Sequence, residues 1–262
     1  MDSVSRWISR WIPSASGGWS PSGLNSRQIL AAPFHLLSSL GKSILSLLFP
    51  PYCLVCNSLL EANERLICES CWHDLPEINE DRDLLIEIQS KFANEVYFSK
   101  VIAIWEFSPT VQTAIHHLKY RNFRLLANRM GIVIAERLNL LNLSIDDTIL
   151  IPVPLHKTRI RERGYNQSAL LCHAIASETG FFYHDHILKR IRYTQSQTKL
   201  NVSERLKNVQ NAFKVVFPPK IQNKIVILVD DVITTGATAN ECAGELMRAG
   251  AETVYLCSAA KA

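Results

Sequence analysis

The stretch Ile225–Thr238 constrains the fold of this chain more than any other, because it joins an apolar run to two acids and a threonine-rich turn. Ile225–Val229 is unbroken, apolar and rich in β-branched residues, which is typical of a parallel strand covered on both faces. Ala239–Arg248 is expected to form a helix that ends at Gly250. A buried strand that leads directly into a helix favours an α/β fold.

Two acids, Asp230 and Asp231, follow the apolar run, at the end of the strand where open parallel sheets bind their ligands. The next residues offer hydroxyls and backbone N–H groups at a helix N-terminus, where unpaired donors and the helix dipole attract anions. They are Thr234, Thr235, Gly236, Ala237 and Thr238. An acid pair can also be a solvated turn, and threonines are ordinary helix caps, but their joint occurrence favours a phosphate site.

Four of the seven cysteines have the spacing C-x2-C-x11-C-x2-C, which predicts a closed structural zinc site made of four thiolates. They are Cys53, Cys56, Cys68 and Cys71. A pair of disulfides is the alternative and would suit an exported chain. No cleavable signal peptide is evident, however, and the other three cysteines lie in apolar patterns typical of buried reduced thiols. We therefore expect zinc and a cytoplasmic protein.

Length and composition allow one sizeable domain with a small module, because the chain has 262 residues of which 47% are hydrophobic. The net charge of +4 is mild and does not by itself indicate a nucleic-acid-binding protein.

The predicted domain organisation has four parts. Residues 1–28 form a disordered tail, 29–49 an amphipathic helical segment, 50–95 a zinc-knuckle module and hood, and 96–262 the main domain. The apolar segment falls short of an uninterrupted membrane span. It could instead dock on a membrane surface or a partner, although we expect it to pack on the zinc module.

Within the main domain, strands alternate with helices, which predicts a parallel sheet flanked by helices. Strands are expected at Val96–Phe107 (an edge strand or hairpin), Thr148–Val153 and Thr253–Cys257, with weak candidates at Phe181–Tyr183 and Ile187–Leu188. Helices are expected at Thr110–Lys119, Phe123–Leu138 and Leu170–Thr179, the last ending at Gly180.

A second loop suited to anions follows the strand at Thr148–Val153. It carries Leu155, His156, Lys157 and Arg159 and continues through further arginines to Gln167. In an open sheet this loop would lie at the same carboxyl edge as the acid pair. Alone, the segment would be interpreted as a solvated basic helix start; beside the acid pair it favours a diphosphate site.

The stretch Lys189–Phe213 is basic and polar and has no convincing apolar face before Leu206. It predicts a flap that closes over the site, excludes water and supplies cations such as Arg192. An exposed hairpin or linker is the alternative.

The apolar strand, the two acids and the threonine-rich loop resemble the signature of the type I phosphoribosyltransferases. The resemblance implies that Asp230 and Asp231 bind the ribose 2- and 3-hydroxyls of phosphoribosyl pyrophosphate (PRPP), while Thr234–Thr238 surround its 5-phosphate. Carboxylates are acceptor-only groups that suit vicinal hydroxyl donors, and loop amides suit a dianion.

Taken in order, the motifs resemble the ComF family, the competence-protein branch of these enzymes, over roughly Leu48 to Ala260. They are the cysteine knuckle after Pro50 and Pro51, His117–Tyr120, PVPLHKTR, RGYNQ, TQSQTKL, Arg205 with Asn208, and VDDVITTGAT. Glutamine-dependent PRPP amidotransferases share the PVP loop and the flap, but no amidotransferase half is visible, so an ammonia-using reaction is not expected.

Three functions follow from the resemblance. The first is transfer of the phosphoribosyl group of Mg-PRPP to an unidentified acceptor, with Arg159, Lys157 and Arg192 neutralising the leaving pyrophosphate and Mg²⁺ bound mainly to substrate oxygens. The second is a PRPP or nucleotide sensor without turnover. The third is an accessory role in DNA uptake, with single-stranded DNA or competence proteins as partners. The histidines His116, His117 and His156 are candidate acceptor contacts, the first two more simply explained by packing.

Overall fold

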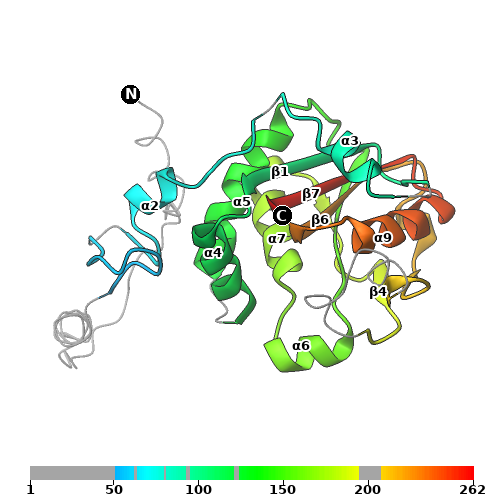
Figure 1. Ribbon diagram of the computed structural model, residues 1–262. Helices are drawn as coiled ribbons and strands as arrows, with labels where there is room; N and C mark the ends of the chain where they lie inside the picture. Colours follow the sequence, from blue (N-terminus) through cyan, green and yellow to red (C-terminus); the bar gives the residue numbers. More distant parts are fainter. Residues whose placement is uncertain (1–50, 62–63, 80, 93–94, 121–123, 195–207) are drawn as a thin grey trace, which may run out of the picture. The chain divides into compact units, whose positions relative to one another are not determined.

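The computed structural model describes residues 51–61, 64–79, 81–92, 95–120, 124–194 and 208–262 (Figure 1). All of them belong to one compact unit, Pro50–Ala262. The predictions for residues 1–28 and 29–49, and for the middle of the flap, concern parts of the chain outside this description. Among the described helices, none combines the length and the apolar character that a membrane crossing needs.

The centre of the unit is a five-stranded sheet in the order β1-β7-β6-β2-β3, in which every neighbouring pair is parallel. Its strands are β1 (Lys100–Glu106), β2 (Thr148–Pro152), β3 (Phe182–Tyr183), β6 (Ile225–Ile233) and β7 (Thr253–Lys261). The predicted parallel sheet is thereby confirmed, and the predicted edge strand is β1. The strand β6 occupies the centre of the sheet, between β7 and β2.

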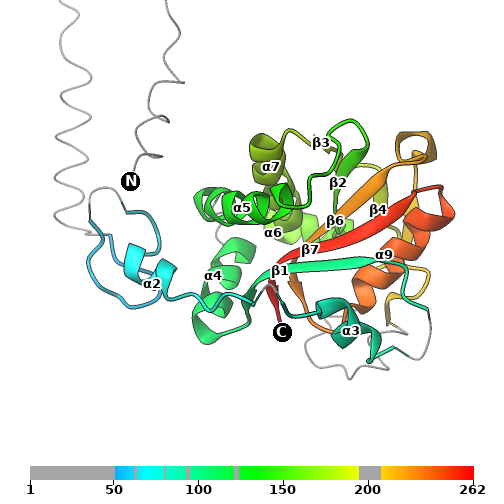
Figure 2. The same ribbon diagram turned by 90° about the horizontal axis from the view of Figure 1, so that it is seen from above.

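Helices cover both faces of the sheet, as Figure 2 shows with the sheet nearly edge-on. Val226 and Leu228 pack with residues of α9, whereas Ile227 and Val229 pack with residues of α4, α5 and α7. All four side chains are fully buried, which explains why the strand is an unbroken apolar run. These helices are α4 (Pro109–Tyr120), α5 (Arg124–Asn139), α7 (Gln167–Thr179) and α9 (Ala237–Arg248).

Three differences from the predicted elements bear on the site. β6 continues to Ile233, four residues beyond the predicted Val229, because its ladder with β7 is paired as far as Lys261. α7 begins at Gln167 rather than Leu170, because the side chain of Asn166 caps it. The weak strand at Ile187–Leu188 does not join the main sheet; it becomes β4 (Leu188–Arg190), antiparallel to β5 (Phe213–Val215).

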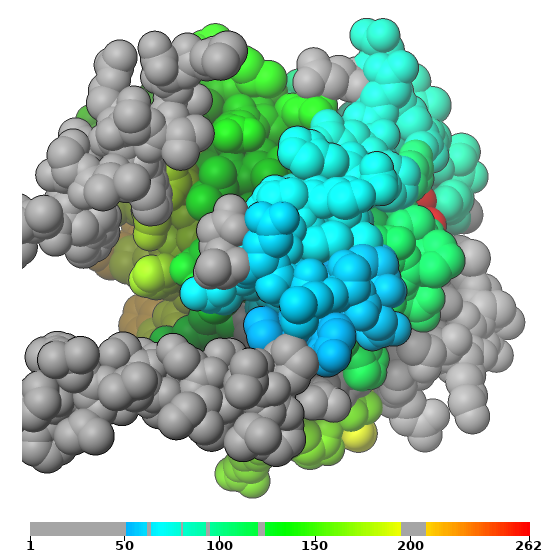
Figure 3. All heavy atoms as spheres, turned by 90° about the vertical axis from the view of Figure 1, so that its left-hand side faces the viewer, coloured from blue at the N-terminus to red at the C-terminus, as the bar shows by residue number. Residues whose placement is uncertain are grey.

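The cysteine module packs against β1 and α5. The rings of Trp72, in α2 (Glu69–His73), and Trp105, in β1, meet edge to face with centroids 5.5 Å apart. The guanidinium of Arg129 lies 4.1 Å from the Trp72 ring centroid and 2.5 Å from the Glu69 carboxylate. Figure 3 shows the module and the segment after it, in blue and cyan, as one continuous surface.

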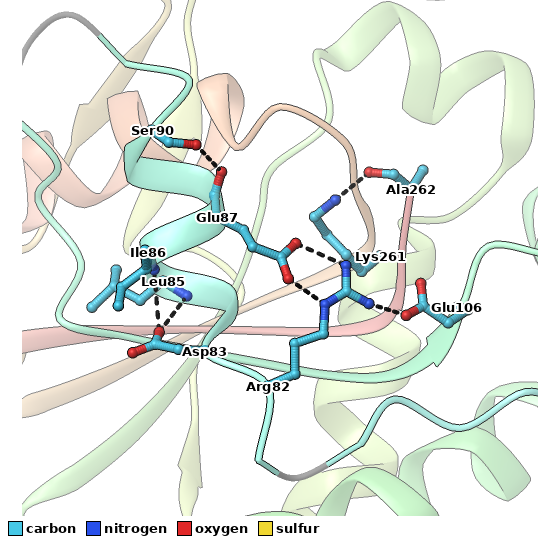
Figure 4. A network of polar contacts seen from close by, with 9 residues as sticks. All are labelled: Arg82, Asp83, Leu85, Ile86, Glu87, Ser90, Glu106, Lys261 and Ala262. Atoms are coloured by element: carbon cyan, nitrogen blue, oxygen red, sulfur yellow. Dashed lines mark hydrogen bonds and ion pairs between the residues drawn. The ribbon is translucent and has the colours of Figure 1, made fainter.

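The segment after the module contains a helix that the sequence analysis missed, α3 (Leu84–Gln89). Asp83 caps it by accepting from the N–H groups of its first turn. Arg82 then connects Glu87 of α3 with Glu106 of β1 (Figure 4). These contacts fix α3 beside the carboxyl end of the sheet. A short 3-10 helix, η3 (Pro218–Lys220), precedes β6.

Candidate functional site

The acid pair lies within the last part of β6. One oxygen of Asp230 accepts from the Ser168 hydroxyl (3.0 Å) and from the backbone N–H of Asp231 (2.9 Å). One oxygen of Asp231, a residue only 4% exposed, accepts from the backbone N–H of Val232 (3.0 Å). Asp230 lines two neighbouring cavities and Asp231 lines one of them, so neither acid is directed into the apolar core.

The threonine-rich loop follows β6 directly and forms the wall of the first cavity, of about 370 Å³. Thr234, Thr235, Gly236, Ala237 and Thr238 all line it. No side chain caps α9 at Gly236, and the Thr235 hydroxyl accepts from the backbone N–H of Ala237 (3.3 Å). The cavity therefore borders the N-terminus of α9, the end of a helix that favours anions.

Gly236 is required at this position for two reasons. Its φ of +79° lies in the left-handed region. In addition, a Cβ there would lie 2.9 Å from the Cγ2 of Ile88 in α3. The helix that the sequence analysis missed thus supports the loop from behind, while the loop's other side stays open to the cavity.

The second cavity, of about 240 Å³, is lined by the segment after β2, by the start of the predicted flap and by both acids. Its charged and polar lining residues are Lys119, His156, Arg159, Arg163, Gln167, Arg190, Tyr193, Thr194, Asp230, Asp231 and Thr238. Lys119, Asp230 and Thr238 line both cavities, which therefore meet at the acid pair. We call the first the loop cavity and the second the basic cavity.

The predicted basic loop is partly helical. The His156 ring accepts from the N–H of Thr158 and starts α6 (Lys157–Arg163), which ends at Gly164 with a φ of +81°. Leu155, His156 and Arg159 line the basic cavity as expected. Lys157 lies in the first turn of α6 and is not among the described lining residues of either cavity.

The structure brings Arg190 rather than Arg192 to the basic cavity. Arg192 is exposed, and its guanidinium donates to the backbone carbonyls of Asn208 (3.1 Å) and Gln210 (2.5 Å). It therefore ties together the two ends of the predicted flap. The role predicted for Arg192 remains a prediction, and Arg190 is the additional candidate.

Arg190 is largely buried, and burial lowers the pKa of its guanidinium. It donates to the Thr194 hydroxyl and lies 5.3 Å from the Phe213 ring centroid, but its Nε has no hydrogen-bond partner among the described residues. A largely buried cation is costly, and an anion in the cavity would offset that cost. Arg190 lies in a stretch that the sequence marked only as generally basic.

The electrostatics of the acid pair differ from those of exposed aspartates. Burial, followed by repulsion from Asp231, raises the pKa of Asp230 to about 8. The ammonium of Lys119 opposes this rise, and its Nζ lies 2.7 Å from the second carboxylate oxygen of Asp231. In the sequence, Lys119 is recognisable only as part of the motif His117–Tyr120.

The candidate histidines separate into two groups. His156 lines the basic cavity, and its ring meets that of Tyr193 edge to face, with centroids 5.3 Å apart. His116 and His117 lie on α4 and line neither cavity, and their rings contact each other at a centroid distance of 5.9 Å. Packing is the simpler explanation for these two.

The four cysteines form one cluster, with all four sulfur atoms within 4.8 Å of one another and none in a disulfide. The sulfur of Cys53 accepts from the backbone N–H groups of Val55 and Cys68, both at 3.4 Å. Hydrogen bonds from Ser58 lower the pKa of Cys56 to about 6. Four converging sulfurs with N–H donors around them suit a structural zinc ion, and the predicted site is confirmed.

Comparisons with known proteins bear on the cysteine module and on the family of the chain. Residues 44–82 match the model of the double zinc ribbon domain. The chain is 31% identical to the DNA utilization protein YhgH of Salmonella typhimurium over 61% of this chain and 70% of that protein. It is 31% identical to competence protein F of Haemophilus influenzae, over 64% and 75% of the two chains.

Two solved structures resemble part of the chain. One is the Bacillus subtilis glutamine PRPP amidotransferase complexed with ADP and GMP, with 20% identity, 50% and 25% of the two chains covered, and a TM-score of 0.33. The other is the Leishmania tarentolae HGPRT-ase in complex with GMP, with 13% identity, 51% and 65% covered, and a TM-score of 0.29.

The relatives of known sequence, the zinc-ribbon match and the cysteine cluster together identify the family. The chain belongs to the ComF family of competence proteins.

Proposed function

We propose that the protein binds Mg-PRPP and transfers its phosphoribosyl group to an acceptor that is still to be identified, with release of pyrophosphate. Asp230 and Asp231 bind the ribose hydroxyls, and Thr234–Thr238 bind the 5-phosphate. Leu155, His156 and Arg159 frame the diphosphate in the basic cavity, and Lys157 and Arg192 are further cations for it. The reduced cysteines favour the cytoplasm as its location.

One observation carries the proposal: the acid pair lies where a cavity at the N-terminus of α9 meets a cavity lined by arginines. A ligand with an anionic group at each end and hydroxyls between them would satisfy all three parts. The amides suit a phosphate dianion, the carboxylates suit hydroxyl donors, and the guanidinium groups suit a diphosphate.

The reaction would break the bond between the sugar C1 and the diphosphate oxygen while the acceptor forms a new bond to C1. The sugar then has oxocarbenium character. Arg159 and Arg190 would neutralise the departing diphosphate, and the two aspartates would orient the ring. Mg²⁺, bound chiefly by substrate oxygens and water, would add positive charge at the diphosphate. Fixed charges act most strongly if the flap excludes water from the site.

Calorimetry with Mg-PRPP tests this assignment on the wild type and on Asp230→Asn/Asp231→Asn. We expect saturable binding by the wild type and a loss of about 100-fold or more in the double variant, because two charge-assisted contacts are removed. Asp146 and Asp147, a second adjacent pair that is exposed and lines neither cavity, provide the matched control as Asp146→Asn/Asp147→Asn. Equal binding by the wild type and the first variant would exclude the assignment.

A PRPP sensor would have the same binding behaviour, so turnover needs its own assay. Pyrophosphate release from Mg-PRPP in the presence of a panel of acceptors separates the transferase from a sensor. Release above the rate of the Asp230→Asn/Asp231→Asn variant supports transfer, and binding without release supports a sensor.

The names of the relatives favour a second candidate, an accessory role in DNA handling. The basic residues of the chain could contact the backbone of single-stranded DNA, and binding of this kind falls steeply with salt. Salt-dependent binding of single-stranded DNA that survives saturation with Mg-PRPP would support this role. Binding that Mg-PRPP abolishes would instead place the DNA phosphates in the same site.

A further inference from the structure

Lys119 holds a position that the proposed function has not used. It lies in the last turn of α4, and it is one of three residues that line both cavities. Its side chain is only 26% exposed, and its Nζ lies 2.7 Å from the second carboxylate oxygen of Asp231. This contact is therefore an ion pair inside the candidate site, unlike the exposed pairs that contribute little to stability.

The backbone around Lys119 is fixed by the segment that builds the basic cavity. The hydroxyl of Tyr165, between α6 and α7, donates to the carbonyl of Leu118 at 2.6 Å. Leu118 itself is fully buried in the core. The backbone next to Lys119 is thus held by Tyr165 and by the core, whereas the long lysine side chain has several rotatable bonds through which its ammonium can change direction.

The ammonium occupies a bonding position that a sugar would need. One oxygen of Asp231 already accepts from the N–H of Val232, and the other faces Lys119. One oxygen of Asp230 is engaged by Ser168 and by the N–H of Asp231. A ribose hydroxyl that binds to Asp231 must therefore share its oxygen with the ammonium or displace it.

We propose that Lys119 is an exchangeable counter-ion: it neutralises Asp231 in the free protein and moves to the ligand's diphosphate when a phosphoribosyl ligand binds. This inference rests on the proposed function and adds a residue and a step to it. Lys119 and Asp231 both line the basic cavity, so the ammonium lies beside the space where the diphosphate would bind. In this exchange the Lys119 ammonium leaves the Asp231 carboxylate and binds the more highly charged diphosphate. The ribose hydroxyls then donate to the carboxylate in its place.

The inference predicts that Lys119 discriminates between ligands. Mg-PRPP carries the diphosphate, whereas ribose 5-phosphate has the same sugar and 5-phosphate but lacks it. In Lys119→Met the ratio of the two affinities should fall by about tenfold or more, because one charge-assisted contact to the diphosphate is lost. Ribose 5-phosphate should bind at least as tightly as before, because no ion pair has to be broken.

Calorimetry with both ligands, in the presence of Mg²⁺, measures this ratio in the wild type, Lys119→Met and Lys119→Arg. The arginine variant keeps the charge and should retain most of the discrimination. Lys214→Met, which removes an exposed lysine of β5 that lines neither cavity, is the control and should behave as the wild type.

The outcomes separate this inference from the proposed function. If the wild type does not bind Mg-PRPP, both proposals fail. If it binds and the affinity ratio is the same in Lys119→Met, the proposed function stands and the exchange is excluded. Equal weakening of both ligands would also exclude the exchange, because it would indicate a general effect on the shape of the site.

Discussion

Asp230 combines burial with a neighbouring carboxylate, and both favour its neutral form. The Ser168 hydroxyl and the Asp231 N–H partly compensate by donating to its charged form. Ionisation of such a residue lowers the stability of the ligand-free protein, and in the proposed function the sugar hydroxyls would stabilise the charged form by donating to it. Such a conflict between stability and binding is typical of functional sites.

The raised pKa of Asp230 predicts how stability depends on pH. The stability that protonated Asp230 contributes to the folded protein is fully present below the pKa of this residue in the unfolded chain, about 4. It is lost as the pH rises through the folded value of about 8. We therefore expect the melting temperature of the ligand-free wild type to fall relative to that of Asp230→Asn between about pH 4 and pH 8, the interval bounded by these two values. A constant difference across this range would contradict the raised pKa.

Arg190 predicts a trade-off of the same kind. Arg190→Met removes a largely buried guanidinium whose Nε has no partner among the described residues. The ligand-free variant should unfold at a temperature no lower than the wild type, because the desolvation cost of the charge disappears. Its affinity for Mg-PRPP should fall by about tenfold or more. Thermal unfolding and calorimetry measure the two effects; a destabilised variant with normal affinity would make Arg190 structural.

The sequence could predict some site residues and not others for a physical reason. The acids and the threonine-rich loop directly follow an apolar strand, so their place at the sheet edge follows from local pattern. Lys119 and Arg190 reach the site only because α4 and β4 pack at that edge, which depends on contacts between distant parts of the chain. Local pattern marked these two residues only as members of a motif and of a basic stretch, and did not place them at the site.

At the scale of elements, the main helices and strands were predictable because each is amphipathic or continuously apolar. The helix α3 was missed because it is short, lies in a polar stretch and depends on Arg82, Glu87 and Glu106 to hold it to β1. The extension of β6 past its apolar run was missed because its partner β7 imposes it. In the sequence, the residues of α6 were recognisable only as a run of basic residues.

The contact between α5 and α7 is close enough to test by substitution. A Cβ at Gly131 would lie 2.4 Å from the Cβ of Ala174. Gly131→Ala should therefore destabilise the protein by about 1–3 kcal/mol despite the higher helix propensity of alanine. Gly131→Ala/Ala174→Gly removes the clash and should recover most of the loss. Urea unfolding measures the stability of both variants. If Gly131→Ala were as stable as the wild type, α5 and α7 would be able to move apart at little cost.

The cysteine cluster predicts a folded module that depends on metal. Cys56→Ser/Cys71→Ser leaves two of the four thiolates, so bound zinc should fall from about one ion per chain to nearly none. Protease cleavage within residues 51–79 should become faster. Cys172→Ala, which alters a buried thiol outside the cluster, should keep its zinc. Resistance to protease without zinc would mean that packing of Trp72 on Trp105 suffices to hold the module.

At the scale of the whole unit, the site is assembled from segments far apart in the chain. The parallel sheet places the ends of β2 and β6 side by side, so the basic cavity and the loop cavity meet at the acid pair. α3 supports the loop from behind, and the cysteine module packs against the same edge strand, β1, that α3 contacts. The fold thereby brings together the three parts of the proposed site: the loop cavity, the acid pair and the basic cavity.

A crystal structure after soaking with PRPP and Mg²⁺ tests this arrangement most directly. We predict the ribose hydroxyls on Asp230 and Asp231, the 5-phosphate against Thr234–Thr238, and the diphosphate beside Arg159 and Arg190, with the Lys119 ammonium turned away from Asp231. A ligand bound elsewhere, or a sugar that makes no contact with the two aspartates, would contradict the account.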